Sequence, residues 1–489
     1  MFPPITDIMN VFATFKAETE TLQNIISEQG MEISRLNHRI DSKDREILLL
    51  KRENNLLQAK LSEYEKPVKD SHNSSIAPSQ EPIPSRAVRR TVSLRKKSEL
   101  KSGGQPGHVG TTLMQVSTPD HIIEHTPDYC QQCGRSLSDE LPDSLGVRQV
   151  VDLPEIKPVI YEHRIHGKQC SCGCYNKATF PDEARAPMSY GPNIRAVISY
   201  LHTVQCIPYE RLSETLRECF NVKLSQGTVD NILVSMQNSS DEIYEQIRHR
   251  ITQSAVVGAD ETGANVKSKL QWIWGFQTDK LTYMFHDSSR GKKAIDKYFP
   301  QGLPDSTLVT DRYSAYFNCI VKEHQICLAH LLRDLTYLSE LDKNQDWSSR
   351  LKELFQEAIH IRKTMDWDSI PRKDLFKRLD DLLNFPLHTL HKDFGRLQRS
   401  LLKHRNSIFR FLSNPDIPYD NNASERAIRL FKIKQKISGG FRSEKGADIF
   451  TQLLSIADTS KKNGQSRLNA LKLIAQTKPI VSNYMIRDK

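Results

Sequence analysis

Three acidic residues occupy positions at which carboxylates often take part in catalysis. Asp260 and Asp311 each end a short apolar run, residues 255–260 and 306–311, that predicts a buried strand. Ligand-binding residues of α/β proteins gather at such strand ends. Glu425 follows a proline-containing break and enters a predicted helix. If the fold brings the three carboxylates together, their repulsion favours bound cations, and Mg²⁺ is the hard ion that suits oxygen ligands. Two such ions about 4 Å apart activate a water and stabilise the leaving oxygen of a phosphodiester.

Each acid also has a purely structural interpretation. Asp260 begins Asp-Glu-Thr-Gly, a common turn sequence, and Asp311 could pair with the adjacent Arg312 at the surface. Asn422 and Glu425 fit a capping box, in which the glutamate completes a helix start. The spacing of the acids does not choose between these interpretations and catalysis.

Cysteines form a second group with possible chemistry. Nine are spread over 489 residues, too sparsely for a secreted disulfide framework. Two close pairs, Cys130-x-x-Cys133 and Cys170-x-Cys172, predict a structural zinc site with four thiolates. Cys174 is an extra thiol that could replace a partner, and a free buried thiol is the alternative for any single cysteine. The pattern favours metal ligation in a reducing cytoplasm over disulfide chemistry.

The charge balance points to a polyanionic partner. The chain has 69 Lys and Arg against 59 Asp and Glu, a net charge of +10, which most simply suits nucleic acid. Within residues 85–101, seven basic residues stand against one acid, Glu99. This stretch cannot bury enough apolar surface to fold alone, so it either lies along a phosphate backbone or is a solvated linker. Its basic residues are Arg86, Arg89, Arg90, Arg95, Lys96, Lys97 and Lys101.

Residues 16–66 carry a heptad repeat. Isoleucine recurs at the a positions and leucine at most d positions, a pattern that favours a parallel two-stranded coiled coil. Asn54 at a fixes register in such coils, whereas Gln29 and Lys43 at d weaken the seam. The alternative is one amphipathic helix packed on its own domain. The apolar seam residues are Leu22, Ile26, Ile33, Leu36, Ile40, Ile47, Leu50, Leu57 and Leu61.

The rest of the chain predicts a multidomain α/β protein. Helical patterns within 190–250 include two helices joined by a short turn, which resemble a helix-turn-helix, although any helical hairpin gives this signal. Strands and a helix within 253–330 predict a mixed sheet, and 331–412 are helical throughout. No run approaches the ~20 apolar residues of a membrane-spanning helix, and no secretory signal pattern is visible, so we expect no membrane partner. The predicted strands are 255–260, 270–277, 281–286, 306–311 and 325–330.

Short motifs follow one another in a characteristic order. They lie at 103–108 (Gly-Gly-Gln-Pro-Gly-His), 130–133, 148–154, 190–192, 225–228, 259–262 (Ala-Asp-Glu-Thr), 310–316 (Thr-Asp-Arg-Tyr-Ser-Ala-Tyr), 327–330 (Cys-Leu-Ala-His) and 420–429 (Asp-Asn-Asn-Ala-Ser-Glu-Arg-Ala-Ile-Arg). Over nearly its whole length, the chain thereby resembles the transposases of the insertion-sequence-66 family. That family belongs to the DDE group, whose catalytic domain has a ribonuclease-H-like fold.

The resemblance implies roles for individual residues. Asp260, Asp311 and Glu425 would bind Mg²⁺ or Mn²⁺ and catalyse DNA cleavage and strand transfer. Cys327 and His330 resemble a Cys-x-x-His motif that would support the site or touch DNA, without an assigned metal; packing is the alternative for Cys327. Arg312 departs from the glycine that is usual beside the second aspartate, and the basic tract 434–440 departs from the commoner Arg-Lys-Asn form. The residues expected to contact DNA are Arg89, Arg90, Arg95, Lys96, Lys97, Arg426, Arg429, Lys434 and Lys436.

These patterns predict a transposase that acts on double-stranded DNA as a homodimer, in a bacterial-type cytoplasm near the nucleoid, with accessory proteins of the same element. The alternatives are a non-catalytic DNA-binding regulator derived from such an enzyme and a zinc-dependent scaffold, which would explain the cysteines but not the acids. The predicted segments are a coiled coil (16–66), a basic linker (67–104), a zinc module (105–180), a helical DNA-binding region (190–250), a ribonuclease-H-like catalytic domain (253–330 and 415–460), a helical insertion (331–412) and a C-terminal tail (461–489).

Overall fold

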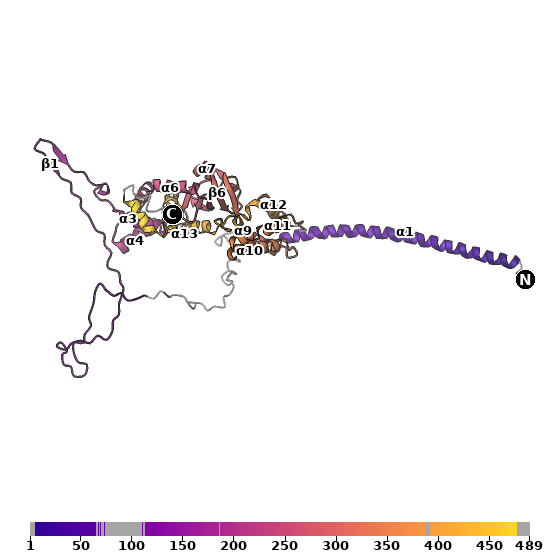
Figure 1. Ribbon diagram of the computed structural model, residues 1–489, viewed down its shortest axis with the longest axis horizontal. Coiled ribbons are helices and arrows are strands. Elements are labelled where there is room, and N and C mark those ends of the chain that lie inside the picture. The colour runs from indigo at the N-terminus through magenta and orange to yellow at the C-terminus, as the bar shows by residue number, and fades with distance from the viewer. Residues whose placement is uncertain are drawn as a thin grey trace. The chain divides into compact units, whose positions relative to one another are not determined.

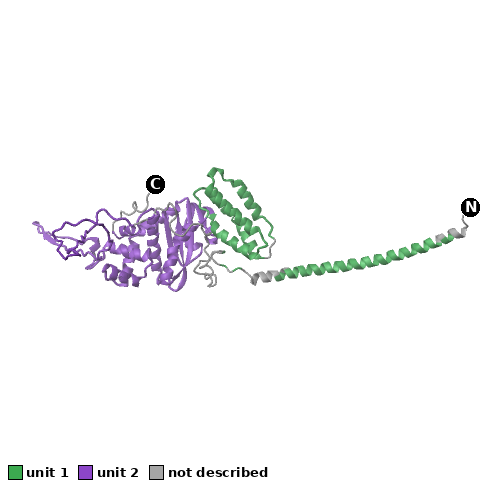
Figure 2. Ribbon diagram, turned by 90° about the horizontal axis from the view of Figure 1, so that it is seen from below, with its two compact units in different colours: residues 1–85, 325–419 green, residues 86–324, 420–489 purple. Residues whose placement is uncertain are grey.

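Two structural units make up the computed structural model of the chain, which describes residues 5–64, 67, 69, 73, 110, 113–184, 186–387 and 391–476. Unit 1 combines Met1–Ser85 with Gln325–Tyr419, and unit 2 combines Arg86–His324 with Asp420–Lys489 (Figure 2). Each unit is therefore assembled from two separate parts of the chain. The basic stretch 85–101 and the motif at 103–108 lie outside the described residues.

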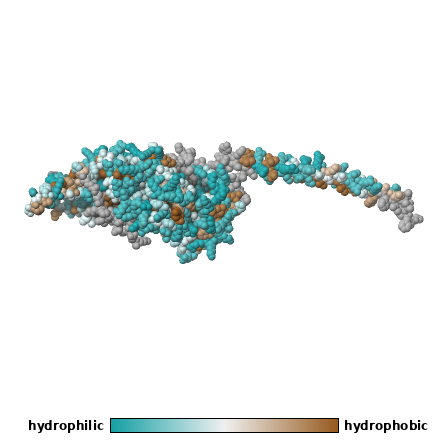
Figure 3. Space-filling model, turned by 90° about the horizontal axis from the view of Figure 1, so that it is seen from above, coloured by the Kyte–Doolittle hydropathy of each residue, from teal (hydrophilic) through white to brown (hydrophobic). Residues whose placement is uncertain are grey.

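Helix α1 (Ile5–Tyr64) is one continuous helix of 60 residues (Figure 1). Its sequence is rich in Leu and Glu and contains no proline, which suits a long helix. Apolar side chains are exposed along it and interspersed with polar ones (Figure 3). The exposed residues include the heptad positions Leu22, Ile26, Ile33, Leu36, Ile40, Ile47, Leu50 and Leu57.

The remainder of unit 1 consists mainly of helices joined by short connections. They are α9 (Leu328–Leu341), α10 (Trp347–Thr364), α11 (Arg372–Leu383) and α12 (Lys392–Lys403). Leucines at helical spacing on α9, such as Leu331, Leu335 and Leu338, are buried and supply its apolar face. The indole of Trp347 is fully buried and donates to the Leu382 carbonyl at 2.8 Å, which ties α10 to α11.

Unit 2 is built on a mixed sheet with the strand order β5-β4-β3-β6-β7. Strands β3, β4 and β5 are antiparallel neighbours, whereas β3 and β6 are parallel. The prediction of a mixed α/β sheet is therefore confirmed. The strands are β3 (Val256–Val266), β4 (Lys269–Gln277), β5 (Thr282–Asp287), β6 (Leu303–Thr310) and β7 (Val321–Ile326).

Helices cover both faces of this sheet. The described helices of unit 2 are α3 (Pro192–Thr203), α4 (Tyr209–Phe220), α5 (Gln226–Asn238), α6 (Asp241–Thr252), α7 (Lys292–Tyr298), α8 (Ser314–Phe317), α13 (Asn422–Ser438), α14 (Glu444–Lys462) and α15 (Arg467–Ala475). On one face, Ala264 and Ile273 pack with Phe431 of α13 and Phe450 of α14. Because side chains alternate along a strand, the neighbouring positions pack on the other face, in the cluster that includes α6 and α7.

Residues 113–184 differ from the rest of unit 2 because almost all of them are exposed. Their only regular strands among the described residues are β1 (Gly167–Gln169) and β2 (Tyr175–Lys177), which pair antiparallel. Even large apolar side chains such as Leu141 and Leu145 are 95% and 98% exposed. This segment thus has local turns without a hydrophobic core. No helix in the described part of the whole chain is both long and apolar enough to cross a membrane.

Candidate active site

Two of the predicted catalytic acids belong to adjacent strands of the sheet, Asp260 within β3 and Asp311 directly after the end of β6. Strands β3 and β6 run parallel, and their last paired residues are Gly258 and Val309. Asp260 and Asp311 follow two residues further along each strand direction. Neighbouring strands lie about 4.8 Å apart, so this register places the two aspartates side by side.

The structure corrects the prediction that Asp260 ends its strand. Strand β3 continues to Val266, with Thr262, Ala264 and Val266 buried in alternation. The chain reverses at Lys267 and Ser268, whose φ angles of 50° and 59° suit a tight hairpin. Asp260 therefore lies inside a strand, with strand residues before and after it, and its Asp-Glu-Thr-Gly sequence is not a turn.

Glu425 reaches the same place from the first turns of α13. The Asn421 side chain donates through Nδ2 to the carbonyl of Ala259 at 2.7 Å, and Ser424 Oγ donates to Asn421 Oδ1 at 2.5 Å. These bonds fasten the start of α13 beside Asp260. The predicted capping box is absent from this helix start, because Asn421 is the N-cap and its side chain makes no capping hydrogen bond.

Two glycines allow α13 to approach the sheet. A Cβ atom on Gly258 would lie 2.5 Å from Ser424 Oγ and 2.9 Å from Asn421 Oδ1. A Cβ atom on Gly275 of β4 would lie 3.0 Å from the Ile428 side chain. The small residues of the strands thus set how close Glu425 comes to the aspartates.

The electrostatics of the acids fit a cation site. Burial raises the pKa of Asp260 well above its ordinary value, and the negative charges of Glu261, Asp311 and Glu425 raise it further. A cluster of carboxylates that raise one another's cost of ionisation is stabilised by a divalent cation between them. Oxygen donors of this kind are the ligands of Mg²⁺ and Mn²⁺. The donor set of Asp260, Asp311 and Glu425 therefore fits the divalent metal that the sequence predicts.

The sequence of this chain matches one known protein family. The model of the family described as "Transposase IS66 family" matches residues 187–449, more than half of the chain. The chain belongs to this transposase family. The match contains the five-stranded sheet, helices α3 to α13 and all three acids described above.

Two individual proteins are similar to this chain over shorter stretches. The uncharacterized protein y4jO of Sinorhizobium fredii is 38% identical over 82 residues, which cover 17% of this chain and 26% of that protein. The uncharacterized protein y4qI of the same organism is 26% identical over 266 residues, 46% of this chain and 48% of that protein. The alignments thus span about a quarter and about half of the relatives' lengths.

A fourth carboxylate, that of Glu261, lies near the three acids and was not predicted. Glu261 follows Asp260, so its side chain points to the opposite face of the sheet, where it is only 2% exposed. Tyr316 donates its hydroxyl to Glu261 Oε2 at 2.5 Å, and Arg290 donates through Nη2 to Oε1 at 2.8 Å. Burial raises the pKa of Glu261, and nearby Asp311 adds to this shift. The Ala-Asp-Glu-Thr motif contained this residue, but nothing in the sequence pointed to its partners.

The basic residues of α13 divide into two groups. Arg426, Arg429 and Lys436 are exposed on one side of the helix. Lys434 is buried, 3% exposed, with its ammonium 3.3 Å from the Ile207 carbonyl and 3.4 Å from His202 Nδ1. A side chain in this position does not reach solvent, which corrects the prediction that Lys434 contacts DNA. The predicted DNA contacts Arg89, Arg90, Arg95, Lys96 and Lys97 lie outside the described residues.

The cysteines form two separate turns. Cys130 accepts from Gly134 N at 2.9 Å, and Cys170 accepts from Gly173 N at 2.9 Å through their carbonyls. Both glycines have left-handed φ angles, 73° and 86°, which such turns require. Backbone N–H groups of Cys133 and Cys172 lower the pKa of the Cys130 and Cys170 thiols, respectively. Among the described residues, these thiols do not form a group of three close enough to share one metal.

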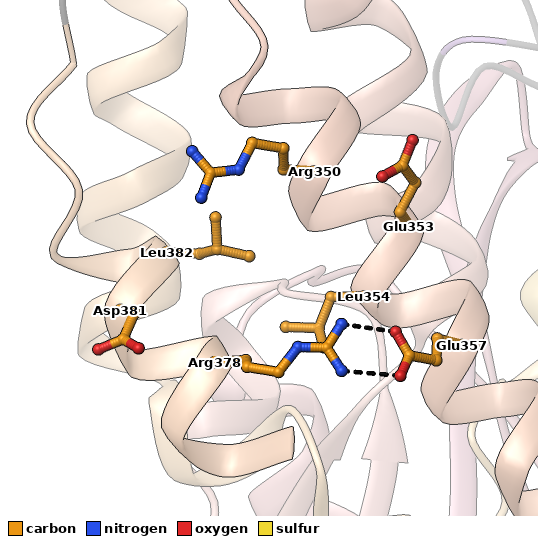
Figure 4. A pocket seen from close by; sticks show the side chains of 7 residues that line it. All are labelled: Arg350, Glu353, Leu354, Glu357, Arg378, Asp381 and Leu382. Carbon is orange, nitrogen blue, oxygen red and sulfur yellow. Dashed lines mark hydrogen bonds and ion pairs between the residues drawn. The ribbon is translucent and has the colours of Figure 1, made fainter. Parts of the chain in front are cut away.

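One further sequence motif, Cys327-x-x-His330, lies in unit 1. Cys327 is the buried N-cap of α9, and His330 follows in the first turn of that helix. Unit 1 also has a pocket of about 280 Å³ between α10 and α11, where Arg378 pairs with Glu357 at 2.6 Å (Figure 4). Its lining of mixed charges, including Arg350, contains none of the predicted catalytic residues.

Proposed function

We propose that this IS66-family protein is a DNA transposase that cleaves the ends of its insertion sequence and joins them to target DNA. The observation that carries the proposal is the convergence of Asp260, Asp311 and Glu425 at one place beside the sheet. The strand order β5-β4-β3-β6-β7, with β6 parallel to β3, supports a ribonuclease-H-like catalytic domain. A divalent metal pair bound there would activate the attacking oxygen and stabilise the leaving oxygen.

The residues of the chain have distinct tasks in this proposal. Asp260 within β3 and Asp311 at the end of the neighbouring β6 present two carboxylates side by side, and Asn421 holds the helix that brings Glu425 to them. The exposed side of α13, with Arg426, Arg429 and Lys436, provides positive charge for phosphate groups. Together these groups hold a phosphodiester where its phosphorus meets the attacking oxygen.

The reaction has two displacement steps at phosphorus. In the first, a water oxygen bonds to phosphorus, the bond to the 3′ oxygen breaks, and a free 3′-hydroxyl remains after proton transfer. In the second, that 3′ oxygen bonds to phosphorus of target DNA and displaces a target 3′ oxygen, which takes up a proton. The number of phosphodiester bonds is conserved in the second step, so no nucleotide cofactor is required.

The test replaces each acid by its amide. Asp260→Asn, Asp311→Asn and Glu425→Gln should each lower Mg²⁺-dependent cleavage of element-end DNA by at least about 10³-fold, while DNA binding persists through phosphate contacts elsewhere. Asp305→Asn is the matched control, because Asp305 is an exposed acid on the same strand β6. Normal cleavage by Glu425→Gln would move the third role to Asp420 or Glu444. Loss of DNA binding in all three variants, or binding without cleavage by the unaltered chain, would support a regulatory protein instead.

We also propose that two copies of α1 form a parallel coiled coil. The exposed a and d residues would bury one another in a dimer, which explains a solvated apolar stripe on an isolated helix. Leu50→Asn with Leu57→Asn should give a monomer in analytical ultracentrifugation. Leu48→Asn with Leu49→Asn is the control, because these leucines are equally exposed but lie off the seam. Equal dissociation of both double variants would contradict the heptad register.

Cys130, Cys133, Cys170 and Cys172 are proposed as ligands of one structural Zn²⁺. The two glycine turns orient each pair of thiols, and the lowered pKa values of Cys130 and Cys170 favour the thiolate form that zinc requires. Cys174 lies at the end of the second turn and is available as a substitute ligand. Accessory proteins of the element and a cytoplasmic location remain predictions from the family resemblance and the cysteine usage.

A further inference from the structure

Arg290 occupies an unusual position next to the candidate active site. It lies in the connection between β5 and α7, which is held by a hydrogen bond from Trp274 Nε1 to the Ser289 carbonyl at 3.2 Å. Its guanidinium lies between two aromatic rings, 4.5 Å from the centre of Trp272 and 4.4 Å from that of Tyr313. Cations stack favourably on aromatic faces in this way. Both the backbone and the side chain of Arg290 are therefore restrained.

The same guanidinium is joined to a buried acid. Arg290 donates from Nε at 3.1 Å and from Nη2 at 2.8 Å to Glu261 Oε1. The other oxygen of Glu261 accepts from the Tyr316 hydroxyl, so both oxygens of this carboxylate are engaged. Since Glu261 is part of strand β3, this ion pair anchors Arg290 to the strand that carries Asp260.

From Arg290 the contacts continue to Asp311. The Tyr313 hydroxyl donates to the Arg290 carbonyl at 3.1 Å, and its ring stacks on the guanidinium. The backbone N–H of Tyr313 in turn donates to Asp311 Oδ1 at 2.8 Å. The position of Tyr313 thus determines the direction of the Asp311 carboxylate, and Arg290 determines the position of Tyr313.

We infer that Arg290 is a positioning residue for Asp311 in the metal-dependent reaction, acting through Tyr313 and anchored by Glu261. The inference rests on the proposed function, since it assumes that Asp311 binds a divalent metal. Groups that orient metal ligands commonly change metal affinity by 10–100-fold when they are removed. Arginine suits this task because its planar fork pairs with a carboxylate and stacks on rings at the same time.

Two effects of removing Arg290 have opposite signs, which makes the inference testable. Loss of a positive charge near the acids strengthens their attraction for a cation. Loss of the correct Asp311 direction weakens metal binding. Replacing Arg290 and Glu261 together, as Glu261→Gln with Arg290→Met, removes one charge of each sign and leaves no buried charge without its partner. The double variant therefore isolates the effect on position.

The experiment measures binding of Mn²⁺ alone to the full chain, from the electron paramagnetic resonance signal of free Mn²⁺. Binding that the unaltered chain shows and Asp311→Asn loses defines the site. We expect Mn²⁺ affinity at this site to fall about tenfold in Arg290→Met and in the double variant, and less in Arg290→Lys. Arg248→Met is the matched control, because Arg248 forms a similar pair with Glu245 in the same unit, away from the acids.

Each outcome decides a separate question. Unchanged Mn²⁺ affinity in the double variant overturns the positioning role. If Arg290→Met also binds Mn²⁺ more tightly than the unaltered chain, Arg290 acts only through its positive charge. Weaker DNA binding with unchanged Mn²⁺ affinity would instead make Arg290 a DNA contact. If Asp311→Asn binds Mn²⁺ as well as the unaltered chain does, the proposed metal site fails, and the inference fails with it. Circular dichroism of each variant establishes that the compared proteins are folded.

Discussion

The two candidate metal sites of unit 2 are built in different ways. Asp260 and Asp311 are held by a sheet whose faces are covered by packed helices, and Glu425 is held by the start of α13. Their positions therefore follow from strand register, two glycines and the hydrogen bond from Asn421 to the Ala259 carbonyl. The cysteines lie in residues 113–184, where turns orient each pair but almost every side chain is exposed. We therefore expect a metal at the packed site to serve chemistry and a metal in the segment without a core to serve folding.

The largest effect is expected from loss of zinc. Cys130→Ser with Cys133→Ser should abolish the binding of one Zn²⁺ per chain, measured by elemental analysis, because apparent zinc-binding free energies of small modules are roughly 10–16 kcal/mol. Residues 113–184 should then be digested rapidly by protease, while unit 2 keeps its thermal transition. Cys219→Ser, an exposed cysteine of α4, is the control. A zinc-free segment that resists digestion as before would remove the contrast between the two sites.

A buried charge in the packed part should give the next largest effect. Burial lowers the pKa of Lys434 to about 8, so between pH 8 and its ordinary value of 10.5 the folded chain binds fewer protons than the unfolded chain. The free energy of unfolding should therefore rise with pH in this range, by up to about 3 kcal/mol, relative to Lys434→Met. Urea unfolding at pH 7.5 and pH 10 measures this difference. Lys436 is an exposed lysine of the same helix, so the unfolding free energy of Lys436→Met should change with pH as that of the unaltered chain does. The same pH dependence in Lys434→Met would contradict the burial of Lys434.

The close approach of α13 to the sheet can be tested at Gly258. Gly258→Ala should lower the free energy of unfolding by about 2 kcal/mol, because the added methyl group meets Ser424 and Asn421. The rate of DNA cleavage should fall by more than the loss of folded protein explains, because a shift of the start of α13 also moves Glu425. The control is Gly227→Ala in α5, where the nearest atom would be Ser225 Oγ at 3.7 Å. If Gly258→Ala is as stable and active as Gly227→Ala, packing at Gly258 does not position Glu425.

The smallest effect concerns stability without metal. The raised pKa of Asp260 means that its ionised form destabilises the folded chain, so stability falls as pH rises from its unfolded pKa through its folded pKa. Asp260→Asn should remove this loss and raise the unfolding free energy of the metal-free protein at neutral pH by about 1 kcal/mol, the usual scale of a stabilising substitution. Thermal unfolding in a chelating buffer measures it. A less stable variant would mean that the acids do not repel one another in the folded chain.

Sequence patterns predicted some parts of this architecture and missed others for physical reasons. Alternation of residue types predicted β4 and β5. The prediction ended β3 too early because Asp-Glu-Thr-Gly after the apolar run is a common turn sequence. Lys434 was assigned to DNA by residue type, although it follows Ile428 and Phe431 at helical spacing and so belongs to the buried side of α13. Helical spacing alone could have revealed that error.

The parts that the sequence could not reveal depend on contacts between distant residues. Glu261 and Arg290 are 29 positions apart, and their pairing requires the hairpin of β4 and β5 to bring both to one face of the sheet. The helix start at Asn421 could not be distinguished from a capping box at Asn422 until the Ala259 carbonyl was known to accept from it. One acid pattern and one family resemblance predicted the triad, but only tertiary contacts show what holds these three residues in place.

The chain order of the acids has a consequence for biosynthesis. Asp260 and Asp311 leave the ribosome early, whereas Glu425 follows 114 residues after Asp311 (425 − 311), behind the helices α9 to α12. At translation rates of roughly 5–20 residues per second, Glu425 is synthesised roughly 6–23 s after Asp311. During this interval the nascent chain has its strands but lacks the third acid. Under the proposed function, a chain still attached to the ribosome, and thus close to its own gene in a coupled system, would be unable to cut DNA before its synthesis is nearly finished.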